Sequence, residues 1–181
     1  MRITTGIYKG RNLKIPKGIR PTQNIARKAI FDILGDIEGL SFLELFAGSG
    51  AVGLEAASRG AKEVVFVEGN PQVLKVLTDN LSGILYTAYH ILPLDAQAAV
   101  KKLARDGRRF DIIFLDPPYH DDLAKKTLQT LGAYDILAST GLIVAQYSKK
   151  DSLPDDLGVL SLLKQSTYGD TRVSFYQKKA V

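Results

Sequence analysis

The segment Asp116-Pro117-Pro118-Tyr119 combines groups that could hold a nucleobase by its amine. Two successive prolines fix φ and carry no N–H, so the carbonyl oxygens beside them remain free to accept hydrogen bonds. Asp116 adds a carboxylate to these acceptors, and Tyr119 adds an aromatic face on which a flat base can stack. Because an all-acceptor site requires an NH2 donor, the segment predicts a receptor for the exocyclic amine of a nucleobase.

A second chemical element lies at residues 41–53, SFLELFAGSGAVG. A short apolar strand runs into the turn Gly48-Ser49-Gly50, and a helix of small residues follows as far as Arg59. Glycine allows positive φ and a close approach of the backbone to a ligand. The first amides of the helix then point toward the space above the turn. The pattern predicts a loop for a nucleotide-like ligand.

The same glycines also spell the dinucleotide fingerprint Gly48-x-Gly50-x-x-Gly53, and Glu68 lies twenty residues after Gly48. An NAD-dependent oxidoreductase is therefore one alternative. However, several acids adjoin the ends of predicted strands, namely Glu44, Glu68, Asp95 and Asp116. This much carboxylate suits a ligand with hydroxyls, amines and a positive centre better than a pyrophosphate. The oxidoreductase alternative also leaves the 116–119 segment without a role.

Strands and helices alternate from Ser41 onward, which is the pattern of a parallel sheet covered on both faces. The predicted strands span residues 41–46, 63–68, 89–94, 111–115 and 142–146. The predicted helices span 51–59, begin at 71 behind the N-cap Asn70, follow Asp95, and span 121–137. Two last strands, 159–163 and 172–177, are joined closely enough for an antiparallel edge pair. We expect a seven-stranded, mostly parallel α/β sheet that binds ligands beyond the carboxyl ends of its strands.

The composition fits one domain over residues 1–181, because 45% of the residues are hydrophobic. The absence of cysteine excludes disulfides and thiolate metal sites. The only histidines are His90 and His120, and His120-Asp121-Asp122 favours a helix N-terminus over a metal site, so no metal is expected. There is no apolar signal region and no run of membrane-spanning length, so we expect a cytoplasmic protein.

Basic residues gather near the N-terminus, because residues 1–31 contain no acid although the whole chain carries a net charge of only +5. Residues 1–20 predict a hairpin that turns at Lys9-Gly10, and residues 21–35 predict a helix with Thr22 as its N-cap. A basic end of this kind indicates a phosphate-backbone partner, so we expect an RNA-binding extension. The candidate nucleic-acid-binding residues are Arg2, Lys9, Arg11, Lys14, Lys17, Arg27 and Lys28.

Taken together, these motifs resemble a known group of enzymes. FAGSG followed by DPPY is similar to the Rossmann-like class I amino-methyltransferases that use S-adenosylmethionine. Residues 1–34, 43–61, 110–119 and the terminal YGDT at 168–171 resemble the bacterial methyltransferases that modify N2 of one guanine in 16S ribosomal RNA. The resemblance covers nearly the whole chain. One departure is Gln146 after Ala145, where an acid is expected in this family.

The resemblance implies roles for single residues. Glu68 would accept from the ribose hydroxyls of S-adenosylmethionine, and Asp95 from its adenine amine. Asp116 and the Pro117 carbonyl would accept from the target amine, while Tyr119 stacks on the base. Pro118 belongs to the same segment. The other cofactor residues would be Glu44, Phe46, Ala47, Gly48, Ser49 and Gly50 around the methionine part, Ala96 beside Asp95, and Arg20 and Thr22 closing over the cofactor.

The expected activity is methyl transfer to a guanine N2 in 16S ribosomal RNA, either free or within the small ribosomal subunit. DPPY alone is shared with N6-adenine methyltransferases of DNA, which are an alternative, although this short chain has no separate target-recognition domain. A non-catalytic RNA-binding assembly factor is another alternative, because it would keep the cofactor fold without turnover.

Overall fold

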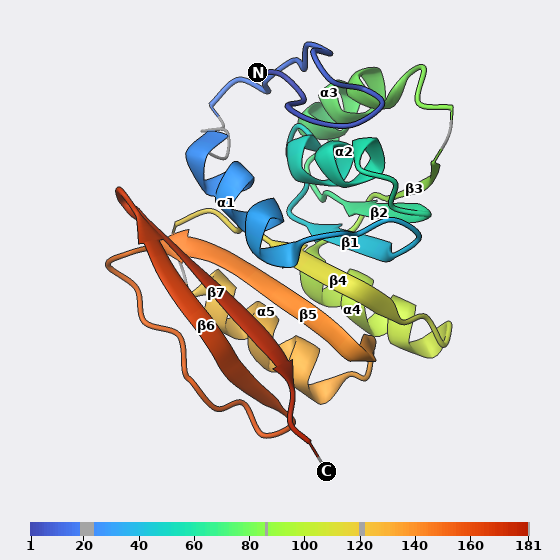
Figure 1. Ribbon diagram of the computed structural model, residues 1–181. Coiled ribbons are helices and arrows are strands. Elements are labelled where there is room, and N and C mark those ends of the chain that lie inside the picture. The colour runs from blue at the N-terminus through green and yellow to red at the C-terminus, as the bar shows by residue number, and fades with distance from the viewer. Residues whose placement is uncertain (19–23, 86, 120–121, 181) are drawn as a thin grey trace.

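The computed structural model describes residues 1–18, 24–85, 87–119 and 122–180 (Figure 1). They form a seven-stranded sheet in the order β3-β2-β1-β4-β5-β7-β6. Strands β1 to β5 are parallel, whereas β7 pairs antiparallel with both β5 and β6. The predicted α/β sheet with an antiparallel C-terminal pair is confirmed.

The element bounds agree with most of the predicted ranges to within one or two residues. The strands are β1 (Ser41–Leu45), β2 (Glu63–Val67), β3 (Ala88–Leu92), β4 (Phe110–Leu115), β5 (Leu137–Ser148), β6 (Leu160–Tyr168) and β7 (Thr171–Lys178). The helices are α1 (Asn24–Leu34), α2 (Ala51–Ser58), α3 (Pro71–Leu81), α4 (Ala96–Arg105) and α5 (Leu123–Ala133). None of the described helices is both long and apolar enough to cross a membrane.

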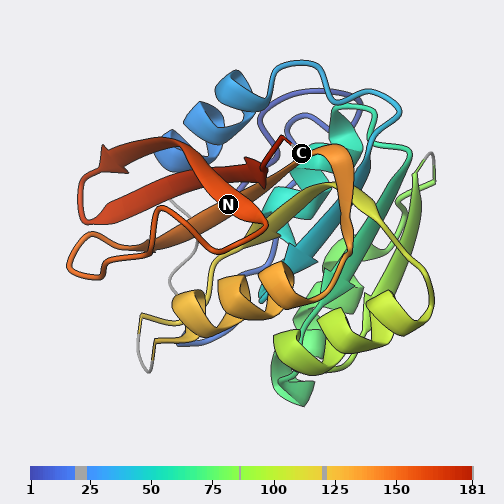
Figure 2. The same cartoon turned by 90° about the horizontal axis from the view of Figure 1, so that it is seen from below.

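Apolar side chains on alternate sides of the strands give the sheet two buried faces. In β1, Phe42 belongs to one hydrophobic cluster and its neighbour Leu43 to the other. Helices α1, α2 and α3 cover the first face, and α4 and α5 cover the second (Figures 1 and 2). Because both faces are covered, the sheet exposes functional groups chiefly at the ends of its strands.

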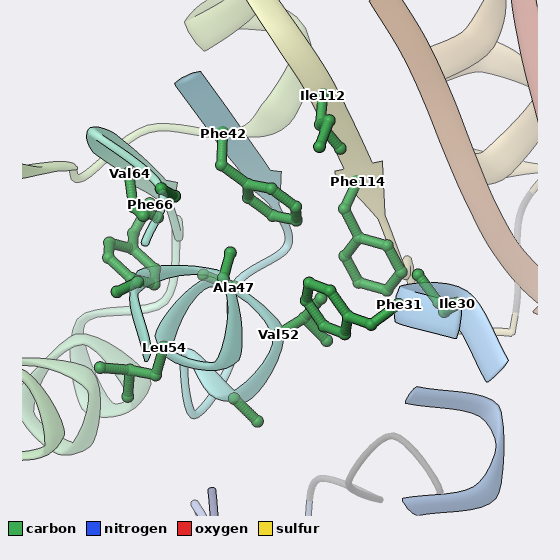
Figure 3. Packing of buried hydrophobic residues seen from close by; sticks show 14 of the residues in the cluster. Ile30, Phe31, Phe42, Ala47, Val52, Leu54, Val64, Phe66, Ile112 and Phe114 are labelled. Atoms are coloured by element: carbon green, nitrogen blue, oxygen red, sulfur yellow. The ribbon is translucent and has the colours of Figure 1, made fainter. Parts of the chain in front are cut away.

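Phe31 anchors α1 to the first face. Its ring stacks on Phe42 of β1 with the ring centroids 6.4 Å apart, and Figure 3 shows it turned toward Phe114 and Val52. The guanidinium of Arg59 lies 4.5 Å from the centroid of the same ring, at the distance of a cation–π contact. These contacts fix the part of the chain that leads into the sheet.

The predicted N-terminal hairpin is present as a looped arm, residues 1–18, with one antiparallel bridge between Arg2 and Asn12. The turn begins earlier than predicted. Its end bonds to the first limb of the arm, because the Gly10 amide donates to the Ile3 carbonyl at 2.9 Å, and its middle bonds to α2. The amide of Ile7 donates to the Ser58 carbonyl at 2.8 Å, and the amide of Tyr8 donates to the Ser58 hydroxyl at 2.9 Å. The arm, which we call the N-terminal arm, is therefore packed onto the domain.

Three predicted boundaries are wrong: β6 ends at Tyr168 rather than at residue 163, and the end of α5 and the start of β5 are both misplaced. The helix expected over 121–137 ends at Ala133, and β5 begins at Leu137, earlier than the predicted residue 142. The reason is a long-range contact: Leu137 pairs with Phe110 of β4, and the amide of Phe110 donates to the Ile136 carbonyl at 2.9 Å. The pairing register then shifts between Phe110 and Ile112, which makes room for the extra residues of β5.

Arg27 is buried, which corrects the prediction that it extends the basic surface. Its side chain is 1% exposed, donates to the Arg2 carbonyl at 2.7 Å, and lies 3.8 Å from the carboxylate of Glu55 on α2. Burial lowers the pKa of the Arg27 guanidinium, while the charge of Glu55 opposes that shift. Because Arg27 precedes Phe31 by one helical turn, the two side chains share the inward face of α1.

Replacing Glu55 with Ala should destabilise the fold by about 3–5 kcal/mol, because it leaves the buried Arg27 without its carboxylate. Glu55 also accepts from the amide and hydroxyl of Thr4, at 2.9 and 2.7 Å. The measurement is the free energy of unfolding in urea. Asp79→Ala is the control, since its exposed ion pair with Lys14 on the same arm should contribute about 0–1 kcal/mol. Equal losses for the two variants would contradict this account.

Candidate active site

The glycine loop between β1 and α2 reverses the chain over a few residues with positive φ. Phe46 has a φ of 60°, Gly48 of 56° and Gly50 of 74°. Positive φ is uncommon for a bulky residue such as Phe46, and strained backbone of this kind concentrates at functional sites. The loop is closed by the Gly50 amide, which donates to the Ala47 carbonyl at 2.7 Å.

The carboxyl of Glu44 binds the start of α2 from inside the protein. It is 2% exposed and accepts from the amides of Val52 at 3.3 Å and Gly53 at 3.0 Å. A Cβ on Gly53 would lie 2.7 Å from Glu44 and 2.5 Å from the ring of Phe66. The third glycine of the fingerprint is therefore required for close packing, which lets the helix amides reach Glu44.

Burial raises the pKa of Glu44 to about 8. The amides of Gly53 and Val52 oppose this shift, whereas the nearby charge of Asp116 adds to it. At pH 7 the Glu44 carboxyl is therefore mostly protonated. The structure thus places a mainly neutral acid under the glycine loop and a second acid, Asp116, close to it.

Glu68 and Asp95 lie at the ends of the next two strands. Glu68 follows β2 and accepts from the amides of Gly48 at 3.0 Å and Asn70 at 2.8 Å, so its carboxylate faces the glycine loop. Asp95 follows β3 and caps α4 by accepting from the Ala98 amide at 2.9 Å. Ala96, the first residue of α4, is buried beside it.

The 116–119 segment leaves β4 next to the glycine loop. Asp116 is half-buried, and its Oδ2 accepts from Nε2 of Gln146 on β5 at 2.8 Å. Pro117 is buried, whereas Pro118 is exposed. The hydroxyl of Tyr119 bonds that of Thr171 at 3.0 Å. The segment is thus attached through side chains at both of its ends.

A small, open pocket adjoins the segment on the side of Tyr119. It is bounded by the beginning of α5 and by the chain that follows β5. Its lining residues are Pro117, Pro118, Tyr119, Asp122, Leu123, Ala124, Lys125, Tyr147, Asp151, Ser152 and Leu153. The open space thus lies beside the ring of Tyr119, and Asp116 is not among the residues that line it.

The structure brings together most of the residues predicted for the site. The glycine loop, Glu44, Glu68, Asp95 and the 116–119 segment all lie along the carboxyl edge of the sheet, where β1 to β4 end. The predictions for Arg20 and Thr22, and the His120-Asp121 pair, fall outside the described residues. Within the described ranges, no group of three or more His, Cys, Asp and Glu residues could hold a metal ion.

The remaining basic candidates differ in what they contact. Arg2, Lys9 and Lys17 are exposed on the N-terminal arm. Lys14 and Lys28 are also exposed but pair with Asp79 at 2.7 Å and Asp32 at 2.6 Å. Arg11 instead donates to the carbonyls of Asn80 and Ser82 at the end of α3. Part of the basic composition thus serves to fasten the arm.

Asn80 is a site residue that the sequence reasoning missed. Its side chain is 4% exposed and bonds both the amide and the carbonyl of Lys14 at 2.9 Å. Its Nδ2 also donates to the carbonyl of Ser49 in the glycine loop at 2.9 Å. The available signal was a polar residue one position before Leu81, inside the apolar stripe of α3.

The strand order and the site at the carboxyl edge define a Rossmann-like class I methyltransferase fold. The model of the family described as Conserved hypothetical protein 95 matches residues 1–177, and the chain belongs to this family. "Putative rRNA methyltransferase YlbH" from Bacillus subtilis is 36% identical over 99% of this chain and 100% of the relative. "Ribosomal RNA small subunit methyltransferase D" from Escherichia coli K12 is 32% identical over 99% of this chain and 91% of the relative.

A solved structure of a similar protein has the same fold. "Putative methyltransferase yhhF from Escherichia coli" superposes with a TM-score of 0.87 at 31% identity, covering 100% of this chain and 99% of that chain. The family resemblance inferred from the sequence is confirmed.

Replacing Glu44 with Gln should remove a pH-dependent loss of stability. Because the pKa of Glu44 is about 8 in the folded protein and 4.5 ordinarily, the folded state binds the proton more tightly. Its contribution is full below about pH 4.5 and is lost as the pH rises to about 8, at about 1.4 kcal/mol per pKa unit. The stability of the Gln variant should therefore not fall between pH 5 and 8.5, whereas that of the wild type should. Its stability at pH 5 should be lower than that of the wild type, because Val52 and Gly53 donate to two Glu44 oxygens and the Gln amide keeps only one acceptor.

The measurement is the urea midpoint between pH 5 and 8.5, with the exposed Glu38→Gln as the control. Parallel pH curves for Glu44→Gln and the wild type would show that Glu44 titrates normally.

Proposed function

We propose that this chain transfers methyl from S-adenosylmethionine to the exocyclic N2 amine of a guanine in 16S ribosomal RNA. The proposal is carried by the adjacency of the 116–119 segment and the glycine loop. Leu45 pairs with Leu115 as the last pair of β1 and β4, so both segments leave the sheet at one level. The names of the relatives, an rRNA methyltransferase and a ribosomal RNA small subunit methyltransferase, support RNA as the substrate class.

The residues around the glycine loop fit S-adenosylmethionine. The Glu68 carboxylate, which faces the loop, suits ribose hydroxyls, and Asp95 at the next strand end suits the adenine amine. The loop 46–50 would hold the methionine part, with Glu44 beneath it, and Ala96 would lie beside the adenine. Arg20 and Thr22 are assigned to cofactor closure from the family resemblance alone. When bound, S-adenosylmethionine supplies an electrophilic methyl group on a sulfonium sulfur.

The chain's own contribution to the reaction is made at the target nitrogen. An exocyclic amine is a weak nucleophile because its lone pair is delocalised into the ring. The Asp116 carboxylate and the Pro117 carbonyl accept from its two N–H groups, which favours a tetrahedral nitrogen and stabilises the positive charge that develops there. Most of the rate then comes from holding that nitrogen in line with the methyl group.

Tyr119 and the N-terminal arm would select the substrate. The base must leave any stack to reach the pocket, where the ring of Tyr119 can cover its face. The exposed residues Arg2, Lys9, Lys14, Lys17 and Lys28 would contact the RNA phosphates. The arm and α1 thus act as the RNA-binding extension of the domain, without the buried Arg27.

The test is methyl transfer from labelled S-adenosylmethionine to small ribosomal subunits and 16S RNA from a strain lacking the gene, with genomic DNA alongside. N2-methylguanosine in the RNA is the expected product.

Asp116→Ala should lower kcat by roughly 10²–10³-fold while the cofactor affinity stays largely unchanged, because the lost acceptor belongs to the target amine.

Other products would change the assignment. N6-methyladenine in DNA would make the protein a DNA methyltransferase. Binding of both RNA and cofactor without transfer would make it a non-catalytic assembly factor. A fully active Asp116→Ala variant would remove Asp116 from the reaction.

The combined variant Arg2→Ala, Lys9→Ala and Lys17→Ala should bind RNA more weakly and with a shallower salt dependence. Each lost phosphate contact reduces the slope of log K against log salt by about 0.7–0.9. The measurement is RNA binding across a salt series. The control, Lys101→Ala with Arg105→Ala, changes basic residues of α4 on the opposite face of the sheet. If both variants keep the wild-type slope, the arm does not bind phosphates.

A further inference from the structure

Two side chains of the C-terminal antiparallel strands contact the two ends of the 116–119 segment. Gln146 of β5 donates to Asp116 at 2.8 Å, and the Thr171 hydroxyl at the start of β7 bonds the Tyr119 hydroxyl at 3.0 Å. No sequence pattern predicted a role for either residue. Both contacts join the segment to strands that are distant from it in sequence. They supply hydrogen bonds through side chains, where the two prolines have no backbone N–H to donate.

Gln146 is buried, and the hydrogen bond that its side-chain amide makes to Asp116 uses the N–H donor, Nε2. Its side chain is 3% exposed, and its Oε1 is buried without a hydrogen-bond partner among the described residues. A carboxylate can only accept, so Nε2 must face Asp116 and Oε1 must point elsewhere. An apolar side chain at this position would avoid the cost of the orphaned oxygen. The amide is therefore explained by what it does to Asp116, whose carboxylate it orients.

Thr171 gives the terminal YGDT motif a physical role. Its side chain is 3% exposed, and it lies opposite Ser148 of β5 and Tyr168 of β6 in the sheet. The turn before it is fixed to the end of β5, because the Lys149 amide donates to the Asp170 carbonyl at 2.9 Å and its ammonium pairs with the Asp170 carboxylate at 2.7 Å. The turn thus places the Thr171 hydroxyl where it can hold the ring of Tyr119.

We propose that Gln146 and Thr171 are positioning residues for methyl transfer, one for the acidic end of the segment and one for its aromatic end. This inference rests on the proposed function. Gln146 acts at the reacting nitrogen through Asp116, so its loss should appear mainly in kcat. Thr171 acts on the seating of the base through Tyr119, so its loss should appear mainly in the KM for RNA.

The experiment measures kcat and KM for small ribosomal subunits, together with cofactor affinity by calorimetry. Gln146→Met keeps the side-chain length but removes the donor, and should lower kcat by roughly 10- to 100-fold, as a misplaced group does. Thr171→Val should raise the KM several-fold, whereas Thr171→Ser, which keeps the hydroxyl, should restore it. Cofactor affinity should stay at the wild-type value in all three variants.

The matched controls make the same chemical changes elsewhere. Gln177→Met lies on β7 opposite Leu142, far along the strand from Thr171, and Thr130→Val lies on α5, where the hydroxyl bonds the Lys126 carbonyl of its own helix. Both controls should show wild-type kinetics. In a double-mutant cycle, Thr171→Val combined with Tyr119→Phe should raise the KM no more than the larger single change. The reason is that each single change already removes the same hydrogen bond, the one between the two hydroxyls.

The outcomes separate this inference from the function on which it rests. If the wild type transfers methyl and Gln146→Met and Thr171→Val match it, or if the Thr171 and Tyr119 effects add fully, the positioning roles are overturned and the function stands. Equal losses in the controls would also overturn them, because the effect would then be one of general stability rather than of the 116–119 segment. If the wild type transfers no methyl at all, both the function and the inference fail.

Discussion

The parallel pairing of β1 with β4 is the constraint on which the site depends. The last paired residues of the neighbouring strands are Leu45 with Val67 and with Leu115, and Val67 with Leu92. Phe46, Glu68 and Asp116 therefore leave the sheet side by side, although the sequence separates them widely. A slip of one residue would turn every side chain of the slipped strand to the opposite face, so the packing of both hydrophobic clusters would be lost together with the alignment of the strand ends.

The local parts of this arrangement could be predicted because local chemistry determines them. Asn70 caps α3 by accepting from the Gln72 amide at 2.9 Å, and Gly35 ends α1 with a φ of 71°, as their residue types indicate. The acids after β2 and β4 could be placed because parallel strands end at one edge. The start of β5 could not, since it is decided by pairing with Phe110 rather than by propensity near Leu137.

Contacts between distant parts of the chain also explain why the positions of Arg27 and Asn80 could not be predicted. A charge on a helix is normally read as outward-facing, and only the position of Phe31 one turn later indicated that Arg27 faces inward. Asn80 connects the arm to the glycine loop through Lys14 and Ser49, which no local pattern encodes. Charge counting therefore overestimated the exposed basic surface. Arg27 is buried, Arg11 attaches the arm to α3, and the basic residues that remain exposed lie on an arm that is packed onto the domain.

The charge balance beside Asp116 accounts for Gln146 where the family resemblance leads one to expect an acid. Glu44 already lies near Asp116, and that charge contributes to the raised pKa of Glu44, about 8. A third carboxyl at position 146 would have to stay protonated to donate to Asp116, or would repel it when ionised. The amide donates at every pH without adding charge. Among the residues that the structure describes, Oε1 of Gln146 has no hydrogen-bond partner. The cost of burying that oxygen supports the proposal that Gln146 serves Asp116 rather than the core.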